Sequence, residues 1–117
     1  MVIMKMYLKN NVIYKPIKKG YTFRLRFRGP AGYLAGFNSI RVDFKSKKSL
    51  TAPAVISCSL GDGIEVEGDD MIITIDKTFT PHLRQGVLYA DGKAESVNAD
   101  PVKLFDGVFE VVDKATP

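Results

Sequence analysis

Three arginines recur at alternate positions in the stretch "YTFRLRFRG", residues 21–29. Alternate residues of a β-strand project from the same face, so Arg24, Arg26 and Arg28 would form a row of guanidinium groups about 6.6–7 Å apart. Such a row suits carboxylates on a neighbouring strand or subunit, because a guanidinium group pairs bidentately with a carboxylate. It also suits successive phosphates of a nucleic-acid backbone. Three interpretations stay open: a solvated or locally paired face, a protein interface, and a nucleic-acid contact.

A second group of charges lies further along the chain, where five carboxylates surround an expected hairpin: Asp62, Glu65, Glu67, Asp69 and Asp70. Oxygen-rich hairpins can hold Ca²⁺, but the ligand order of an EF-hand loop is missing. We therefore expect a solvated turn with no metal.

The residues that usually carry nucleophilic catalysis are scarce, since His82 is the only histidine and Cys58 the only cysteine. His82 follows Pro81 in a turn-like segment, and we expect it on the surface without a role. Cys58 lies between two serines in an apolar strand, which predicts a buried, inert thiol. One histidine and one cysteine make no zinc site, and no phosphate-binding glycine pattern occurs. The sequence predicts no enzyme, no cofactor and no metal.

Charge is divided unevenly between the two halves of the chain. Residues 1–50 hold twelve Lys or Arg and one acid, a formal charge of +11, whereas residues 51–117 hold five Lys or Arg and twelve acids, a charge of −7. In one compact domain these charges lie within a few Debye lengths of one another. Either strands of opposite charge lie side by side and neutralise each other, or basic and acidic faces attract neighbouring copies.

Two-residue alternation dominates the chain, and helical periodicity is nearly absent. We expect strands at Asn11–Ile17, Tyr21–Arg28, Ser39–Phe44, Ala54–Leu60, Met71–Asp76, Val87–Ala94 and Val102–Val112, with a further hairpin arm around Ile64 and Val66. A short helical turn is expected with Thr80 as N-cap, Pro81 at the first helical position and Gly86 closing it. The prediction is an all-β fold: a single antiparallel, Ig-like β-sandwich of about seven or eight short strands, with at most one short helical turn near 80–85.

The length of 117 residues favours one domain. We expect residues 1–10 to form an N-terminal arm or edge strand, 11–113 the sandwich, and 114–117 a frayed tail. The apolar start "MVIMKMYLKNN", with Met4 and Met6, would either extend the sheet or add a strand to a neighbour. A polar loop with Lys47 and Lys48 is a second contact region. No apolar run reaches the roughly 20 residues of a membrane span, and no signal peptide or disulfide is expected.

Four pieces of the chain carry a family resemblance: "KKGYTFRLRF", "YLAGFNSIRVDF", "SLGDGIEVEGDDMIITIDKTFTPHLRQGVLYAD" and "VKLFDGVFEVV". In this order they resemble small virion proteins of tailed bacteriophages, whose β-sandwich is related to the N-terminal module of baseplate upper proteins. The positions that carry the resemblance, within residues 15–113, are Gly20, Asp62, Gly63, Ile64, Thr78 or Thr80, Gly86, Tyr89 and Gly107. The strand "VLYADGKAES" and the arginine row depart from the family pattern. The resemblance implies a structural role in a tail, baseplate or neck, without catalysis.

These observations together predict a non-enzymatic virion structural protein, made in the cytoplasm of the host bacterium. It would assemble with itself, as a ring-type homo-oligomer or a ring-decorating subunit, and with other virion proteins, without contacting a membrane. The expected interface residues are Arg24, Arg26, Arg28, Arg41, Lys47, Lys48, Glu65, Glu67, Met4 and Met6. The alternative is a small basic β module that binds nucleic acid.

Overall fold

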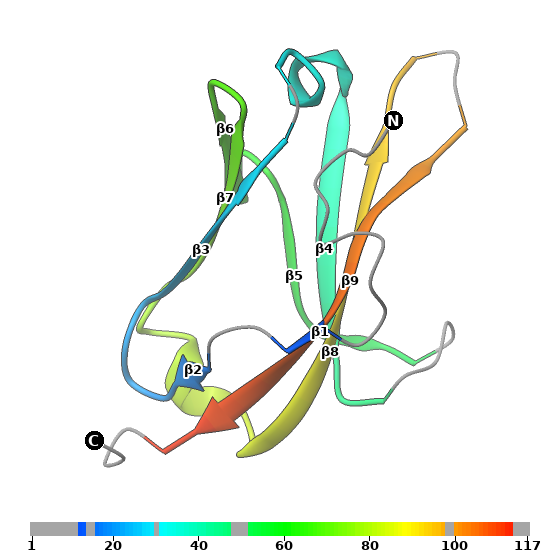
Figure 1. Ribbon diagram of the computed structural model, residues 1–117. Helices are drawn as coiled ribbons and strands as arrows, with labels where there is room; N and C mark the ends of the chain where they lie inside the picture. The colour runs from blue at the N-terminus through cyan, green and yellow to red at the C-terminus, as the bar shows by residue number, and fades with distance from the viewer. Residues whose placement is uncertain (1–11, 14–15, 30, 48–51, 98–99, 114–117) are drawn as a thin grey trace.

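The computed structural model describes residues 12–13, 16–29, 31–47, 52–97 and 100–113 (Figure 1). The predicted N-terminal arm with Met4 and Met6, the tail at 114–117, and Lys48 lie outside these residues. The strands of the described part are β1 (Val12–Ile13), β2 (Ile17–Lys18), β3 (Phe23–Arg28), β4 (Ser39–Lys45), β5 (Ala54–Leu60), β6 (Gly63–Glu67), β7 (Asp70–Ile75), β8 (Gly86–Glu95) and β9 (Val102–Val112). The all-β class is thereby confirmed.

The strands form one mixed sheet in the order β1-β9-β8-β4-β5-β6-β7-β3, with β2 also paired to β9. The sheet curls on itself until it nearly closes, and Figure 1 shows β3, β6 and β7 on one side with β4, β8 and β9 on the other. A purely antiparallel arrangement is wrong, because β1 and β2 run parallel to β9, and β5 meets β6 through a short parallel pairing. The chain between β2 and β9 contains the rest of the fold, which provides the long crossover connection that parallel strands usually need.

The core follows from the two-residue alternation, which turns one set of side chains inward on every long strand. On β3 the inward residues are Phe23 and Phe27, exposed by only 3% and 1%. The Phe23 ring meets Phe109 edge-on at 5.6 Å between centroids, and the Phe27 ring lies 4.6 Å from Phe105. These contacts join β3 to β9 across the interior, since the two strands are not hydrogen-bonded neighbours.

Two short 3₁₀ turns interrupt the strands of the described residues, one more than we expected. The turn at Thr80–His82 lies where a helical turn was predicted, but its N-cap is Phe79 and no side chain caps it. The Thr80 hydroxyl is fully buried and instead accepts from the Gly20 N–H at 3.0 Å and donates to the Tyr21 carbonyl at 2.9 Å. Thr80 therefore ties this turn to the start of β3.

The second 3₁₀ turn, Leu34–Gly36, contradicts the prediction of at most one helical turn. Leu34 is exposed by only 2% and is part of the core, while the flanking Tyr33 and Phe37 rings meet edge-on at 5.0 Å. Burial of these apolar groups stabilises a compact turn between two of the predicted strands.

Gly92 of β8 provides the space that one core ring occupies. It is the register partner of Phe105 on β9, and the pairing shifts directly after it. A Cβ atom at Gly92 would lie 2.5 Å from Phe105 Cε1 and 2.6 Å from Cδ1. The Phe105 ring is fully buried and contacts Phe27, so it has little room to move.

We therefore expect Gly92→Ala to lower the free energy of unfolding by about 1–3 kcal/mol, the usual cost of overpacking a dense core. Urea unfolding measured by circular dichroism checks this. The matched control is Gly36→Ala, because a Cβ atom there meets nothing within 4 Å. Equal unfolding midpoints for the wild-type and Gly92→Ala chains would show that Phe105 does not depend on this glycine.

Candidate interaction surfaces

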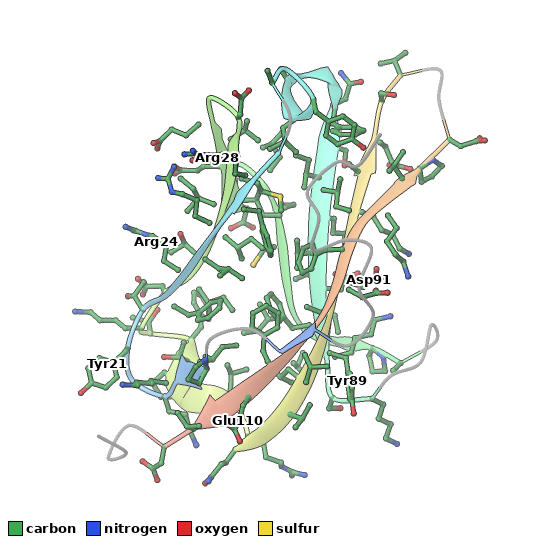
Figure 2. The ribbon with its side chains drawn as sticks, viewed as in Figure 1. Tyr21, Arg24, Arg28, Tyr89, Asp91 and Glu110 are labelled. Carbon is green, nitrogen blue, oxygen red and sulfur yellow. The ribbon has the colours of Figure 1, made fainter. Side chains whose placement is uncertain are left out.

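The arginine row lies on the outer face of β3, opposite the buried phenylalanines. Arg24, Arg26 and Arg28 are all exposed, and their register partners on β7 are Thr74, Ile72 and Asp70. Figure 2 shows Arg24 and Arg28 directed away from the core. The alternation expected from the sequence is therefore present in the strand.

Asp70 is the partner of two of these arginines. It accepts from Arg26 Nη1 at 2.5 Å, from Arg28 Nε at 2.8 Å and from Arg28 Nη2 at 3.2 Å. Its side chain is only 6% exposed, which contradicts the prediction of a wholly solvated acidic turn. The hydrogen bonds from Arg28 and Arg26 outweigh desolvation and lower the pKa of Asp70 to about 2. The same bonds raise the pKa of both arginines.

Carboxylates balance the arginines on this outer face. Glu65 and Glu67 of β6 are exposed on the same face, because they are the register partners of Ile72 and Asp70. Arg26 Nη2 lies 3.5 Å from Glu67 Oε1. The β3–β7–β6 face thus presents three cations and three carboxylates, and Arg24 alone of its arginines makes no ion pair with a described residue.

A second outer face, on β4, β8 and β9, also mixes both signs of charge. Lys45, Glu95 and Glu110 lie on it together with three ion pairs. Each ion pair joins residues of one strand, with N–O distances of 2.9 Å for Arg41–Asp43, 3.8 Å for Lys93–Asp91 and 3.1 Å for Lys103–Asp106. Among the described residues, the buried Oδ1 atom of Asp91 has no hydrogen-bond partner.

Asp43 has the densest set of contacts on this second face. It accepts from Ser57 Oγ at 2.7 Å and from Arg41 Nε at 2.9 Å. Burial acts to raise the pKa of Asp43, but these two hydrogen bonds and the Arg41 charge hold it below its ordinary value.

The sheet order explains how the uneven charge of the two halves is accommodated. The basic strands β3 and β4 come from the first half of the chain, and they lie beside β7, β5 and β8 from the acidic second half. Opposite charges therefore meet within each outer face. Of the two outcomes considered from the sequence, neutralisation between neighbouring strands describes the β3–β7–β6 face, whereas the ion pairs of the second face lie within single strands.

The remaining candidate residues are scattered. Lys47 is exposed beyond the end of β4, and His82 is exposed at the end of its 3₁₀ turn. Cys58 is buried as predicted, and burial together with the nearby Asp62 and Asp43 charges raises the pKa of its thiol to about 11. No group of three or more metal-ligating side chains is assembled within the described residues.

The sequence did not predict a groove of about 650 Å³ between β5 and β7. Its walls come from residues 55–58 of β5, the turn at 61–63, Thr74 and Ile75 of β7, and Phe79. Val55 is 51% exposed and Phe79 is 61% exposed. One signal for Val55 was present, because it shares its parity with the exposed Ser57 and Ser59.

Comparisons with known proteins give only distant likenesses. No family model matches the chain, and no curated protein matches it. A chain from a structure of T cell activation by the bacterial superantigen toxic shock syndrome toxin-1 is 8% identical, with a TM-score of 0.45, over 86% of this chain and 92% of that one. The extracellular domain of the voltage-gated sodium channel beta4 subunit is 16% identical, with a TM-score of 0.39, over 91% and 94%.

The extracellular domains 3–5 of Drosophila OTK are 11% identical, with a TM-score of 0.36, over 89% of this chain and 33% of that one. At these identities and TM-scores none of the likenesses bears on function. Within the described residues, no helix has the length and apolar character needed to cross a membrane.

The stability of the fold should depend on pH through Asp70. Its pKa is about 2 in the folded chain and about 3.9 in an unfolded one, so it stabilises the fold above pH 4, and this stabilisation is lost as the pH falls from about 4 to about 2. Asp70→Asn should be less stable than the wild type at pH 7, with a difference that shrinks through that window. Chemical unfolding at a series of pH values measures it.

The matched control is Asp100→Asn, since Asp100 is exposed and precedes β9. Its difference from the wild type should stay constant through the same pH window. A difference for Asp70→Asn that does not change between pH 5 and pH 2 would contradict the role assigned to the two arginines.

Proposed function

We propose that this chain is a non-enzymatic structural protein of a tailed-bacteriophage virion, in the tail, the baseplate or the neck. It works by binding copies of itself and other virion proteins, and it is made in the cytoplasm of the host. The observation that carries the proposal is the pair of sheet faces, each presenting cations among carboxylates. The assignment to a virion rests on the family resemblance of the sequence.

We also group the fold with the Ig-like β-sandwiches. What supports this is that β3, β7 and β6 face β9, β8 and β4 through a shared core, with Phe23, Phe27 and Phe44 packed against rings of β9. Such a scaffold holds surface side chains in a fixed pattern. Pre-organised charges lose little entropy on binding, which favours specific protein contacts.

A surface that mixes cationic and anionic side chains suits a protein partner better than a nucleic acid. A partner with the opposite pattern satisfies every charge, and mismatched partners bring like charges together. A phosphate backbone laid along β3 would instead meet Asp70 and Glu67 beside the arginines. The aromatic residues of β3 are buried, so no stacking platform for bases lies beside the row.

Arg24 is the residue of this surface that we expect to contact a partner, because Asp70 already engages Arg26 and Arg28. Arg24→Glu should weaken binding of a partner that presents carboxylates to this face about tenfold without altering the fold, since Arg24 makes no ion pair with a described residue. Light scattering over a range of protein and salt concentrations measures it. The matched control is Lys18→Glu, an exposed charge reversal on β2.

A monomer at every concentration and salt level that also binds no virion protein would overturn the proposal. The nucleic-acid alternative gives a different outcome in a gel shift: binding that falls steeply with added salt and is lost in Arg24→Glu.

A further inference from the structure

The sheet is interrupted between β5 and β7. β4 pairs with β5 from Ala54 to Ser59, but on the opposite side β6 pairs only with Ser59 and Leu60. Among the described residues, no strand covers Ala54–Cys58 on that side. A strand edge of this kind presents free N–H and C=O groups that can pair with another chain.

β7 presents a second free edge across the same groove. Its pairing with β6 stops at Ile73, so Thr74 and Ile75 are paired only with β3. Thr74 and Ile75 line the groove together with Val55 and Ile56 of β5. An added strand in this position would therefore have a backbone edge on each side of it.

The turn between β5 and β6 explains why the chain does not fill the gap itself. Gly61 and Gly63 have φ angles of 89° and 94°, in the region that favours glycine. A Cβ atom at Gly63 would lie 3.1 Å from the sulfur of Cys58. This tight turn carries β6 away from β5 and closes one end of the groove.

The groove combines exposed apolar groups with an excess of negative charge. Val55 and Phe79 are each more than half exposed. The charged residues in its lining are Asp62, Glu65, Asp76 and Arg24, three carboxylates and one cation. An extended segment that carries apolar side chains and lysines matches this surface in both respects.

We propose that the groove accepts the N-terminal segment, residues 1–11, of a second copy of this chain as an added strand along β5. The segment "MVIMKMYLKNN" holds six aliphatic or methionine residues among its first eight, with Lys5 and Lys9. Main-chain pairing supplies affinity, and the apolar and charged side chains supply the fit. The inference rests on the self-association in the proposed function and assigns it a site.

The position of β1 makes such an exchange directional. The segment leads into β1, which pairs with β9, whereas the groove lies between β5 and β7; in the order β1-β9-β8-β4-β5-β6-β7-β3, three strands separate β1 from β5. A donor site and an acceptor site on different parts of the surface give a head-to-tail contact. Such contacts close into a ring when the rotation between copies permits it.

Cross-linking between full-length chains tests the inference. One chain carries Met4→Cys, a second carries Val55→Cys, and the two are mixed under mild oxidation; the buried Cys58 thiol, with a pKa of about 11, stays unreactive. We expect heterodimers in at least about tenfold higher yield than with Glu110→Cys, a matched exposed position on β9 (Figure 2). A chain carrying both Met4→Cys and Val55→Cys should give a ladder of covalent oligomers.

A charge variant gives a second readout, because it changes the charge of the groove at a residue that carries no cysteine. Glu65→Lys, added to the Val55→Cys chain, should lower the cross-linking yield about tenfold, whereas Glu110→Lys in the same chain should not. Both are charge reversals at exposed positions on strands.

Two results would overturn the inference. Equal yields at Val55→Cys and Glu110→Cys would show that the segment does not enter the groove. An internal disulfide in the double variant, without oligomers, would show that the segment docks on its own chain. Self-association in light scattering without the Val55 cross-link would reject this site alone, whereas a monomer at every concentration would reject the proposed function as well.

Discussion

The packing of β3 onto β9 is the constraint on which the rest of the structure depends. Phe23 and Phe27 contact the rings of Phe109 and Phe105, and strand side chains alternate with a period of two. Once these phenylalanines point inward, the arginines between them must point outward. A slip of one residue would bury three guanidinium groups, so the core determines the register of the charged surface.

Asp70, the first residue of β7, is a charged side chain that is nevertheless buried. Its side chain is shielded from solvent and bound by two arginines of β3, so the hairpin of β6 and β7 is held to β3 by ionic as well as main-chain hydrogen bonds. On β4, β8 and β9 the ion pairs instead join residues of the same strand. A chain with a strongly basic first half and an acidic second half thereby presents two faces of mixed charge, and two features that we assign to partners are Arg24 and the open edge of β5.

Local features were predictable from the sequence, and non-local ones were not. Ala54–Leu60 and Val102–Val112 have the predicted bounds because alternation and flanking turn residues are read directly along the chain. Strand order, the parallel pairing of β1 and β2, and the Asp70 contacts depend on which distant segments meet. The groove was not predictable for the same reason: it exists because β6 turns away from β5 after Leu60.

The central claim is that this fold works by protein contacts made at the uncovered edge of β5. Hydrogen–deuterium exchange of the full-length chain at rising concentration tests it most directly. We expect those amides of residues 54–58 that do not pair with β4 to exchange rapidly in dilute monomer and to become protected as copies associate, while the amides of residues 88–90 in the covered strand β8 stay unchanged. Exchange at 54–58 that is independent of concentration while the chain self-associates would contradict the account.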